Sequence, residues 1–190
     1  DISLYLDNTG NASILVDDID NGSTDNCSIT DRFLDKVDFT CADVGNVPVT
    51  LTVTDGSGNS DACMATVTVI DTISPVITCP ADLTLPAATG SCDTALVDLG
   101  TPIVSDACGI ASTVNNAPAL FPIDTTLVVW TTTDINGNAS TCTQQIIVID
   151  DQDPVITCPA DVSVSNDTDS CNAVVAGLIA VATDNCDALG

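Results

Sequence analysis

The chain has 190 residues, with 27 acidic and 2 basic side chains and a formal net charge of −25. All of the acidic residues are Asp, and there is no His to serve as a general base or metal ligand. This charge excludes most nucleic-acid binding and attraction to anionic membranes, both of which depend on Lys and Arg. Because 45% of the residues are hydrophobic, the chain is not a disordered acidic tail.

Strands are predicted, in chain order, where apolar and hydroxyl residues alternate, at 49–54, 65–69, 127–133 and 144–149. Asp-Gly-Ser-Gly-Asn at 55–59 and Asp-Ile-Asn-Gly-Asn at 134–138 are typical of hairpin turns. No segment favours a helix, and no apolar run is long enough for direct membrane insertion. The pattern predicts an all-β chain of immunoglobulin-like β-sandwiches.

The chain repeats itself. Residues 67–83 read VTVIDTISPVITCPADL and residues 146–162 read IIVIDDQDPVITCPADV, an offset of 79 residues. An Asp-x-Cys motif recurs at matching places in the chain, at 25–27, 106–108 and 184–186. We therefore predict three tandem repeats: 1–70, which lacks its first strand, a complete repeat 71–149, and the first half of another at 150–190.

The ten cysteines favour disulfides and an oxidising compartment, because none is spaced like the tight Cys pairs of zinc sites. Cysteines at matching places in the repeats suggest two classes of pair. The predicted disulfides are Cys27–Cys63, Cys79–Cys92, Cys108–Cys142 and Cys158–Cys171. Cys41 and Cys186 remain, and their partners are expected outside this window of the chain. A Cys41–Cys186 bridge or two free thiols is the alternative.

The run PVITCPAD at 75–82, with the later Cys92, the Asp-x-Cys motif at 106–108 and the turn at 134–138 before Cys142, resembles a hyalin repeat (HYR) domain. Residues 150–190 resemble its first half. Residues 1–70 are similar to a sister repeat of giant Bacteroidota surface proteins, through LYLD at 4–7, FTC at 39–41 and TDGSGN at 54–59. The resemblance implies an immunoglobulin-like fold, an extracellular or cell-surface location and no enzymatic activity.

Calcium is the predicted cofactor, because it prefers carboxylate and carbonyl oxygens from loops. In an immunoglobulin-like sandwich the B–C and F–G loops share the end that receives the incoming linker. The candidate ligands at those places are Asp71, Asp106, Asp134, Asn136 and Asn138, then Asp150, Asp151, Asp153 and Asp184, and, in the first repeat, Asp25, Asp55 and Asn59. The alternative is that these side chains only build turns.

Several positions are candidate glycosylation sites. Asn11, Asn21 and Asn166 stand in Asn-x-Ser/Thr motifs. The Bacteroidota resemblance implies instead Thr or Ser that follows Asp, which fits Thr72, Thr94 and Thr125.

The two basic side chains, Arg32 and Lys36, are expected to pair with the nearby Asp31 or Asp35, and Trp130 to lie in the core.

These observations favour a disulfide-stapled, elongated array of repeats that serves as a structural or adhesive segment of a secreted or cell-surface fibrous protein. Calcium would stiffen the repeat junctions. The expected partners are neighbouring repeats, copies of the chain in a filament, or surface glycans and proteins. The alternative is a carbohydrate- or protein-binding accessory module of a larger secreted protein or enzyme.

Overall fold

The computed structural model describes residues 1–95 and 98–186, whose regular structure is almost entirely β-strand. The exceptions among these residues are one turn of α-helix, α1 (Val16–Ile19), and one 3-10 turn, η1 (Cys41–Asp43). None of the described helices is long and apolar enough to cross a membrane. The predicted all-β class is confirmed. The chain divides into two compact units, Asp1–Pro80 with Thr101–Asn116 and Val129–Thr143, and Ala81–Gly100 with Ala117–Val128 and Gln144–Gly190.

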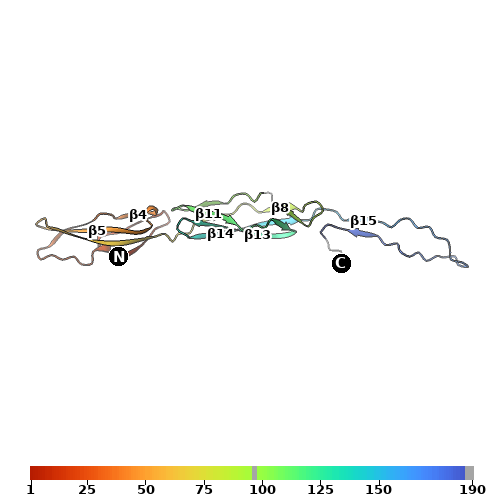
Figure 1. Cartoon of the computed structure of the whole chain (residues 1–190), viewed down its shortest axis with the longest axis horizontal. Coiled ribbons are helices and arrows are strands. Elements are labelled where there is room, and N and C mark those ends of the chain that lie inside the picture. The colour runs from red at the N-terminus through yellow and green to blue at the C-terminus, as the bar shows by residue number, and fades with distance from the viewer. Residues whose placement is uncertain (96–97, 187–190) are drawn as a thin grey trace. The chain divides into compact units, whose positions relative to one another are not determined.

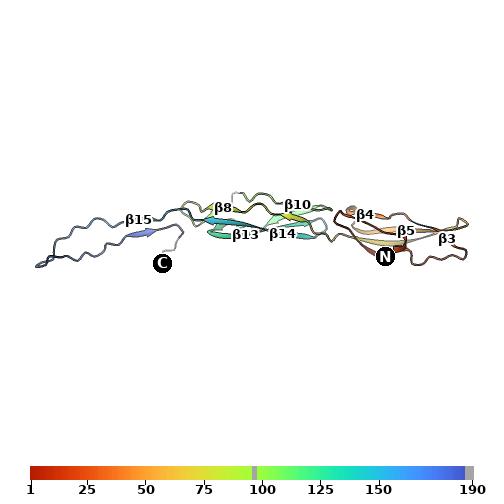
Figure 2. The same ribbon diagram turned by 180° about the vertical axis from the view of Figure 1, so that it is seen from behind.

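The first 70 residues form two packed β-layers (Figures 1 and 2). The larger sheet has the order β1-β6-β5-β3, with β1 parallel to β6, and the smaller sheet pairs β2 with β4. The strands are β1 (Ile2–Tyr5), β2 (Asn11–Ser13), β3 (Ile29–Leu34), β4 (Asp38–Thr40), β5 (Gly45–Asp55) and β6 (Ser60–Ile70).

The core of these residues follows from the alternation in the sequence. Val49 and Leu51 on β5 point inward and are buried, whereas Thr50 and Thr52 lie on the other face. Phe39 on β4 is 1% exposed and packs against them from the smaller sheet. Burying each such side chain contributes roughly 1.5–3 kcal/mol, so the layers are held together mainly by apolar contact.

Residues 76–149 repeat the same plan. The sheet order β11-β13-β14-β8 corresponds strand for strand to β3-β5-β6-β1, and β8 is parallel to β14 as β1 is to β6. Strands β3 and β11 carry a bulge at the same place, between Ile29 and Asp31 in β3 and between Ile110 and Ser112 in β11. The strands are β7 (Val76–Thr78), β8 (Leu83–Pro86), β9 (Asp93–Ala95), β10 (Ile103–Ser105), β11 (Ile110–Asn115), β12 (Leu120–Pro122), β13 (Asp124–Asp134) and β14 (Ala139–Ile149).

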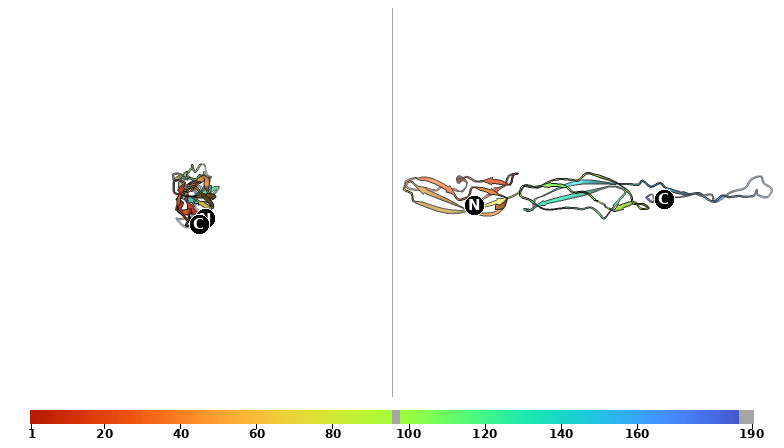
Figure 3. Two further views of the ribbon diagram at one scale, coloured as in Figure 1. Left: turned by 90° about the vertical axis from the view of Figure 1, so that its left-hand side faces the viewer. Right: turned by 90° about the horizontal axis from the view of Figure 1, so that it is seen from above.

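The two long hairpins, β5–β6 and β13–β14, are visible from above in Figure 3. Two-stranded sheets complete the second set, β7 with β10 and β9 with β12. Trp130 on β13 is 7% exposed, which confirms its predicted core position. Beyond residue 150 the described part contains one strand pair, β15 (Val155–Thr157) with β16 (Val181–Thr183).

The structure contains two disulfides among the described residues, and neither was predicted. Cys79 is bonded to Cys142, with a Cα–Cα distance of 5.7 Å, and Cys41 is bonded to Cys108, at 5.1 Å. The predicted pairs Cys79–Cys92 and Cys108–Cys142 are therefore wrong.

The physical reason for the error is the direction of the chain between the cysteines. Between Cys79 and Cys92 the chain runs out along the extended strand β8, with no strand that returns it to Cys79 before Cys92 is reached. A disulfide needs Cα atoms within about 7 Å, and an extended strand advances about 3.3 Å per residue. Cys142 on β14 is bonded instead to Cys79, which directly follows β7, a strand of a different sheet.

The other two predicted pairs, Cys27–Cys63 and Cys158–Cys171, are not formed either, and all four of these thiols are free and exposed. Cys63 corresponds by the 79-residue offset to Cys142. Since Cys142 does not bond to the cysteine of its own Asp-x-Cys loop, the repeat gives no reason for Cys63 to bond to Cys27.

Candidate functional site

The Asp-x-Cys loops at 25–27, 106–108 and 184–186 fold alike. In each loop the Asp carboxylate accepts a hydrogen bond from the backbone amide of the Cys two residues later. The oxygen–nitrogen distance is 2.8 Å in loops 106–108 and 184–186 and 3.4 Å in loop 25–27. This Asx turn is favoured by Asp because its short side chain reaches its own backbone. The turn sets the direction in which the Cys side chain leaves the loop.

A linker aspartate precedes each later repeat and also makes an Asx turn. Asp71 Oδ1 accepts from the amide of Ile73 at 2.9 Å, and Asp150 Oδ1 accepts from the amide of Gln152 at 3.0 Å. The side chain of Asp71 is buried, with the residue only 7% exposed, and its Oδ2 has no hydrogen-bond partner. An unpaired buried carboxylate oxygen is costly, which makes this atom unusual.

The linker aspartates and the Asp-x-Cys loops come together in the same way twice. One carboxylate oxygen each of Asp71 and Asp106 and the sulfur of Cys108 all lie within 4.8 Å of one another. The equivalent atoms of Asp150, Asp184 and Cys186 form a second such trio. The structure thus brings together two pairs of the predicted calcium ligands, each beside a cysteine that was not predicted to belong there.

Most of the other predicted ligands in the second repeat serve their own turn. Asp134 Oδ1 accepts from the amides of Asn136 and Asn138, at 2.9 and 2.8 Å, and its Oδ2 accepts from Asn138 Nδ2 at 2.8 Å. Burial would raise the pKa of Asp134, but the hydrogen bonds from Asn138 and the turn amides lower it below its usual value. Asn138 Nδ2 also reaches the carbonyl oxygen of Asp71, at 3.3 Å, and the buried Oδ1 of Asn136 has no partner.

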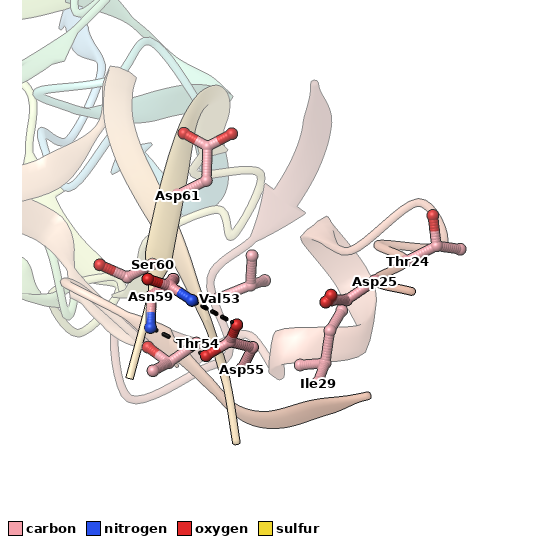
Figure 4. A pocket seen from close by; sticks show the side chains of 9 residues that line it. All are labelled: Thr24, Asp25, Ile29, Val53, Thr54, Asp55, Asn59, Ser60 and Asp61. Carbon is pink, nitrogen blue, oxygen red and sulfur yellow. Dashed lines mark hydrogen bonds between the residues drawn. The ribbon is translucent and has the colours of Figure 1, made fainter. Parts of the chain in front are cut away.

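The first repeat has the same turn in a more open setting. Asp55 accepts from the amides of Ser57 and Asn59 and from the Asn59 side chain, and the last of these lowers its pKa most. Asp25, Asp55, Asn59 and Asp61 help to line a pocket of about 220 Å³. Figure 4 shows Asn59 bonded to Asp55, and Asp25 and Ile29 among the residues that line the same pocket.

The remaining predicted site residues are not drawn into these clusters. Asp151 and Asp153 are exposed and belong to neither trio. Of the glycosylation candidates, Thr94 is half-buried on β9 and pairs with Phe121, which makes it a poor acceptor. The exposed candidates are Asn11, Asn21, Thr72, Thr125 and Asn166. Glycosylation at these five remains a prediction.

The cysteines beside the trios were missed as site residues. Cys108 is bonded to Cys41, and Cys186 lies beside Cys92. Burial, a hydrogen bond with Cys92 and the carboxylate of Asp150 raise the pKa of the Cys186 thiol to about 12. The sequence signal that could have identified these cysteines is the recurrence of Asp-x-Cys at matching places in the repeats. This recurrence implies that the cysteine meets a similar partner each time.

Known proteins resemble this chain in sequence. Residues 70–148 match the family described as HYR domain. Two relatives are named Hyalin: one from Strongylocentrotus purpuratus is 32% identical over 143 residues, and one from Lytechinus variegatus is 35% identical over 133 residues. The alignments cover 70% and 62% of this chain but 12% and 24% of the relatives, so the chain spans a small part of each.

Solved structures resemble it more distantly. The extracellular cadherin domains 1–4 of protocadherin gamma B7 give a TM-score of 0.34 at 12% identity, over 87% of this chain and 53% of that one. The cis-dimer structure of protocadherin gammaB7 EC3-6 gives 0.32 at 13% identity, over 67% and 39%. The sequence match makes residues 70–148 similar to the HYR domain family.

Proposed function

We propose that this chain is a non-catalytic segment of an extracellular structural or adhesive protein, built from tandem β-sandwich repeats that are tied to one another covalently. The observation that carries the proposal is the Cys41–Cys108 disulfide, which links residue 41 of the first repeat to the Asp-x-Cys loop of the second. The relationship to the two hyalins and the many cysteines support an oxidising, extracellular setting.

The two disulfides interlock along the chain. Cys79 lies inside the segment closed by Cys41–Cys108, and Cys142 lies outside it. When residues 41 and 142 are pulled apart, either bond can therefore carry the force in place of most of the chain between them. Removing one disulfide leaves the other as a bypass, so the arrangement suits a protein that must resist extension.

Force spectroscopy of the oxidised chain, pulled from its ends, tests this mechanical function. Every variant, the parent included, carries Cys92→Ser and Cys186→Ser, so that only the two disulfides of the structure can carry the force. With either disulfide intact, fewer than about 40 residues can extend between positions 41 and 142, or about 140 Å at 3.5 Å per residue. With both removed, about 100 residues and roughly 350 Å become available. We expect Cys41→Ser/Cys108→Ser and Cys79→Ser/Cys142→Ser to behave nearly as the parent, and the quadruple variant to extend far more. A parent chain that extends as far as the quadruple variant would overturn the proposal.

The second part of the proposal is that calcium binds between Asp71 and Asp106. The unpaired, buried Oδ2 of Asp71 supports it, because a cation would satisfy an oxygen that now lacks a partner. Cys108 contributes no thiolate, since its sulfur is in the disulfide. The site residues therefore suit a hard cation that takes oxygen ligands, and carbonyls or water would complete the shell.

Thermal melts with calcium, with chelator and with sodium chloride of matched ionic strength test the calcium site. A ligand of the folded state raises the melting temperature by mass action. We expect Asp71→Asn and Asp106→Asn each to reduce the gain, while Asp161→Asn, an exposed residue outside the trios, keeps it. A gain that sodium reproduces is screening of the −25 charge and would eliminate the calcium site.

A further inference from the structure

Two free cysteines, Cys92 and Cys186, lie against each other. The Cys92 thiol hydrogen-bonds to the carbonyl oxygen of Asn185, and Cys186 Sγ lies 3.5 Å from the carbonyl oxygen of Ser91. Asn185 Nδ2 donates to that same Ser91 oxygen, at 2.8 Å. Each sulfur is thus held against the residue that precedes the other cysteine.

The Cys41–Cys108 disulfide has the same surroundings. Cys41 Sγ lies 3.7 Å from the carbonyl oxygen of Gly10. A Cβ placed on Gly10 would come 2.5 Å from Cys41 Sγ, 3.3 Å from Ala107 Cβ and 3.6 Å from Cys108 Sγ. Gly10 therefore marks the place where this disulfide packs, and any side chain there would collide with its sulfur.

Strand register shows which residues correspond. In β2–β4, Asn11 pairs with Thr40 and the next pair contains the buried Phe39. In β9–β12, Asp93 pairs with Pro122 and the next pair contains the buried Phe121.

The residue before each first strand is then Gly10 in one case and Cys92 in the other. The residue after each second strand is Cys41 in one case and Ile123 in the other. Ile123 confirms this neighbourhood, because its amide donates to the carbonyl oxygen of Cys92 at 3.0 Å.

The two places are thus complementary. In the first case Gly10 leaves room, and Cys41, directly after β4, supplies the sulfur. In the second case Ile123 stands in the place of Cys41, and Cys92, in the place of Gly10, supplies the sulfur. The opposing cysteine comes in both cases from an Asp-x-Cys loop with the same 2.8 Å Asx turn. From this correspondence we propose that Cys92 and Cys186 form a disulfide, the counterpart of Cys41–Cys108.

Closing the bond requires an oxidant. The two thiols lose two protons and two electrons as one S–S bond forms, and a small disulfide such as oxidised glutathione accepts the electrons and becomes two thiols. The bond would tie residue 92 of the second repeat to the Asp-x-Cys loop of the third. It would also exclude a metal thiolate at Asp150, Asp184 and Cys186, as Cys41–Cys108 does at the first trio. The inference holds whether or not calcium binds.

The test is disulfide mapping of the 190-residue protein equilibrated in a glutathione redox buffer. The protein is alkylated, digested at Asp without reduction, and analysed by mass spectrometry. We expect peptides linked through Cys92–Cys186, alongside Cys41–Cys108 and Cys79–Cys142. A link from Cys92 to Cys79 or Cys171, or alkylation of both Cys92 and Cys186 in protein that contains Cys41–Cys108, would overturn the proposal.

Serine variants provide the matched controls. Cys92→Ser should expose one additional thiol to maleimide, at Cys186, and Cys186→Ser should expose Cys92. Cys171→Ser removes an exposed free thiol and should lower the labelling by one without affecting the link. Retention of Cys79–Cys142 in each variant shows that the fold is intact. Labelling that falls by one for Cys92→Ser would mean that Cys92 is free in the parent, against the proposal.

Discussion

The strand pairs β7–β10 and β15–β16 have the same register and identical first strands, yet very different surroundings. Val76 pairs with Ser105 as Val155 pairs with Thr183, and each first strand reads Val-Ile-Thr. Ile77 is half-buried, whereas Ile156 is 65% exposed. The second sheet that covers β7–β10 is not present among residues 150–186. Local sequence is therefore enough to pair two strands, but burial of their apolar faces depends on other strands.

The largest expected contrast is between core side chains of these two regions. Phe121 on β12 is fully buried, so Phe121→Ala should lower the free energy of unfolding of residues 71–149 by about 3–5 kcal/mol. Ile156→Ala, at an exposed site, should change it by less than about 0.5 kcal/mol. Urea denaturation followed by the fluorescence of Trp130 measures both. Equal losses would show that β15 is buried in solution and that the contrast is false.

A smaller effect is expected at Gln144, which is fully buried on β14. Its Nε2 donates to the carbonyl oxygens of Ala81 and Leu99, at 2.7 and 3.0 Å. Gln144→Met keeps the length of the side chain but leaves both oxygens without this donor, which should cost about 2–4 kcal/mol. Gln145→Met, on the exposed face of the same strand, is the matched control and should be nearly neutral in the same urea titration.

Gly10 and Gly22 separate backbone strain from a collision at the disulfide. Both have positive φ, +73° and +89°, so alanine at either costs about 1–2 kcal/mol. Only at Gly10 does the new Cβ meet Cys41 Sγ, whereas nothing lies within 4 Å at Gly22. Gly10→Ala should therefore destabilise more than Gly22→Ala and slow formation of Cys41–Cys108 in a redox buffer. Equal effects in melts and disulfide mapping would refute the close packing around that bond.

The smallest effect concerns pH. Hydrogen bonds lower the pKa of Asp55 and of Asp134 in the folded protein, so both stabilise the fold when ionised. That stability is present above the unfolded pKa near 4 and is lost as the pH falls below it. We expect the urea midpoint to drop between pH 5 and pH 3, and Asp134→Asn to reduce that drop. Asp161→Asn should leave the drop unchanged, and an unchanged drop in Asp134→Asn would contradict this role of the turn.

The strands and turns were largely determined by local sequence. Alternating Val and Thr placed the long strands β5, β6, β13 and β14, because side chains of a strand point to opposite faces in turn. The Asp-x-x-Gly-Asn turns were also predicted from local sequence, because the Asp of each turn accepts hydrogen bonds from amides within four residues. The repeated motifs likewise predicted tandem repeats, and the sheet order of residues 76–149 copies that of the first 70 residues.

Only the tertiary structure decided which distant groups meet. Arg32 was expected to pair with a sequence neighbour but contacts Asp20 and Asp17, at 2.6 and 2.9 Å, and Lys36 pairs with Asp43. Residues adjacent along a strand point to opposite faces, so their charges do not meet. The predicted disulfides were wrong for a related reason, because the spacing of cysteines along the chain does not show which positions of the sheets face each other. The register of β2–β4 and β9–β12, which no local pattern contains, is what reveals Gly10 and Cys92 as equivalent places.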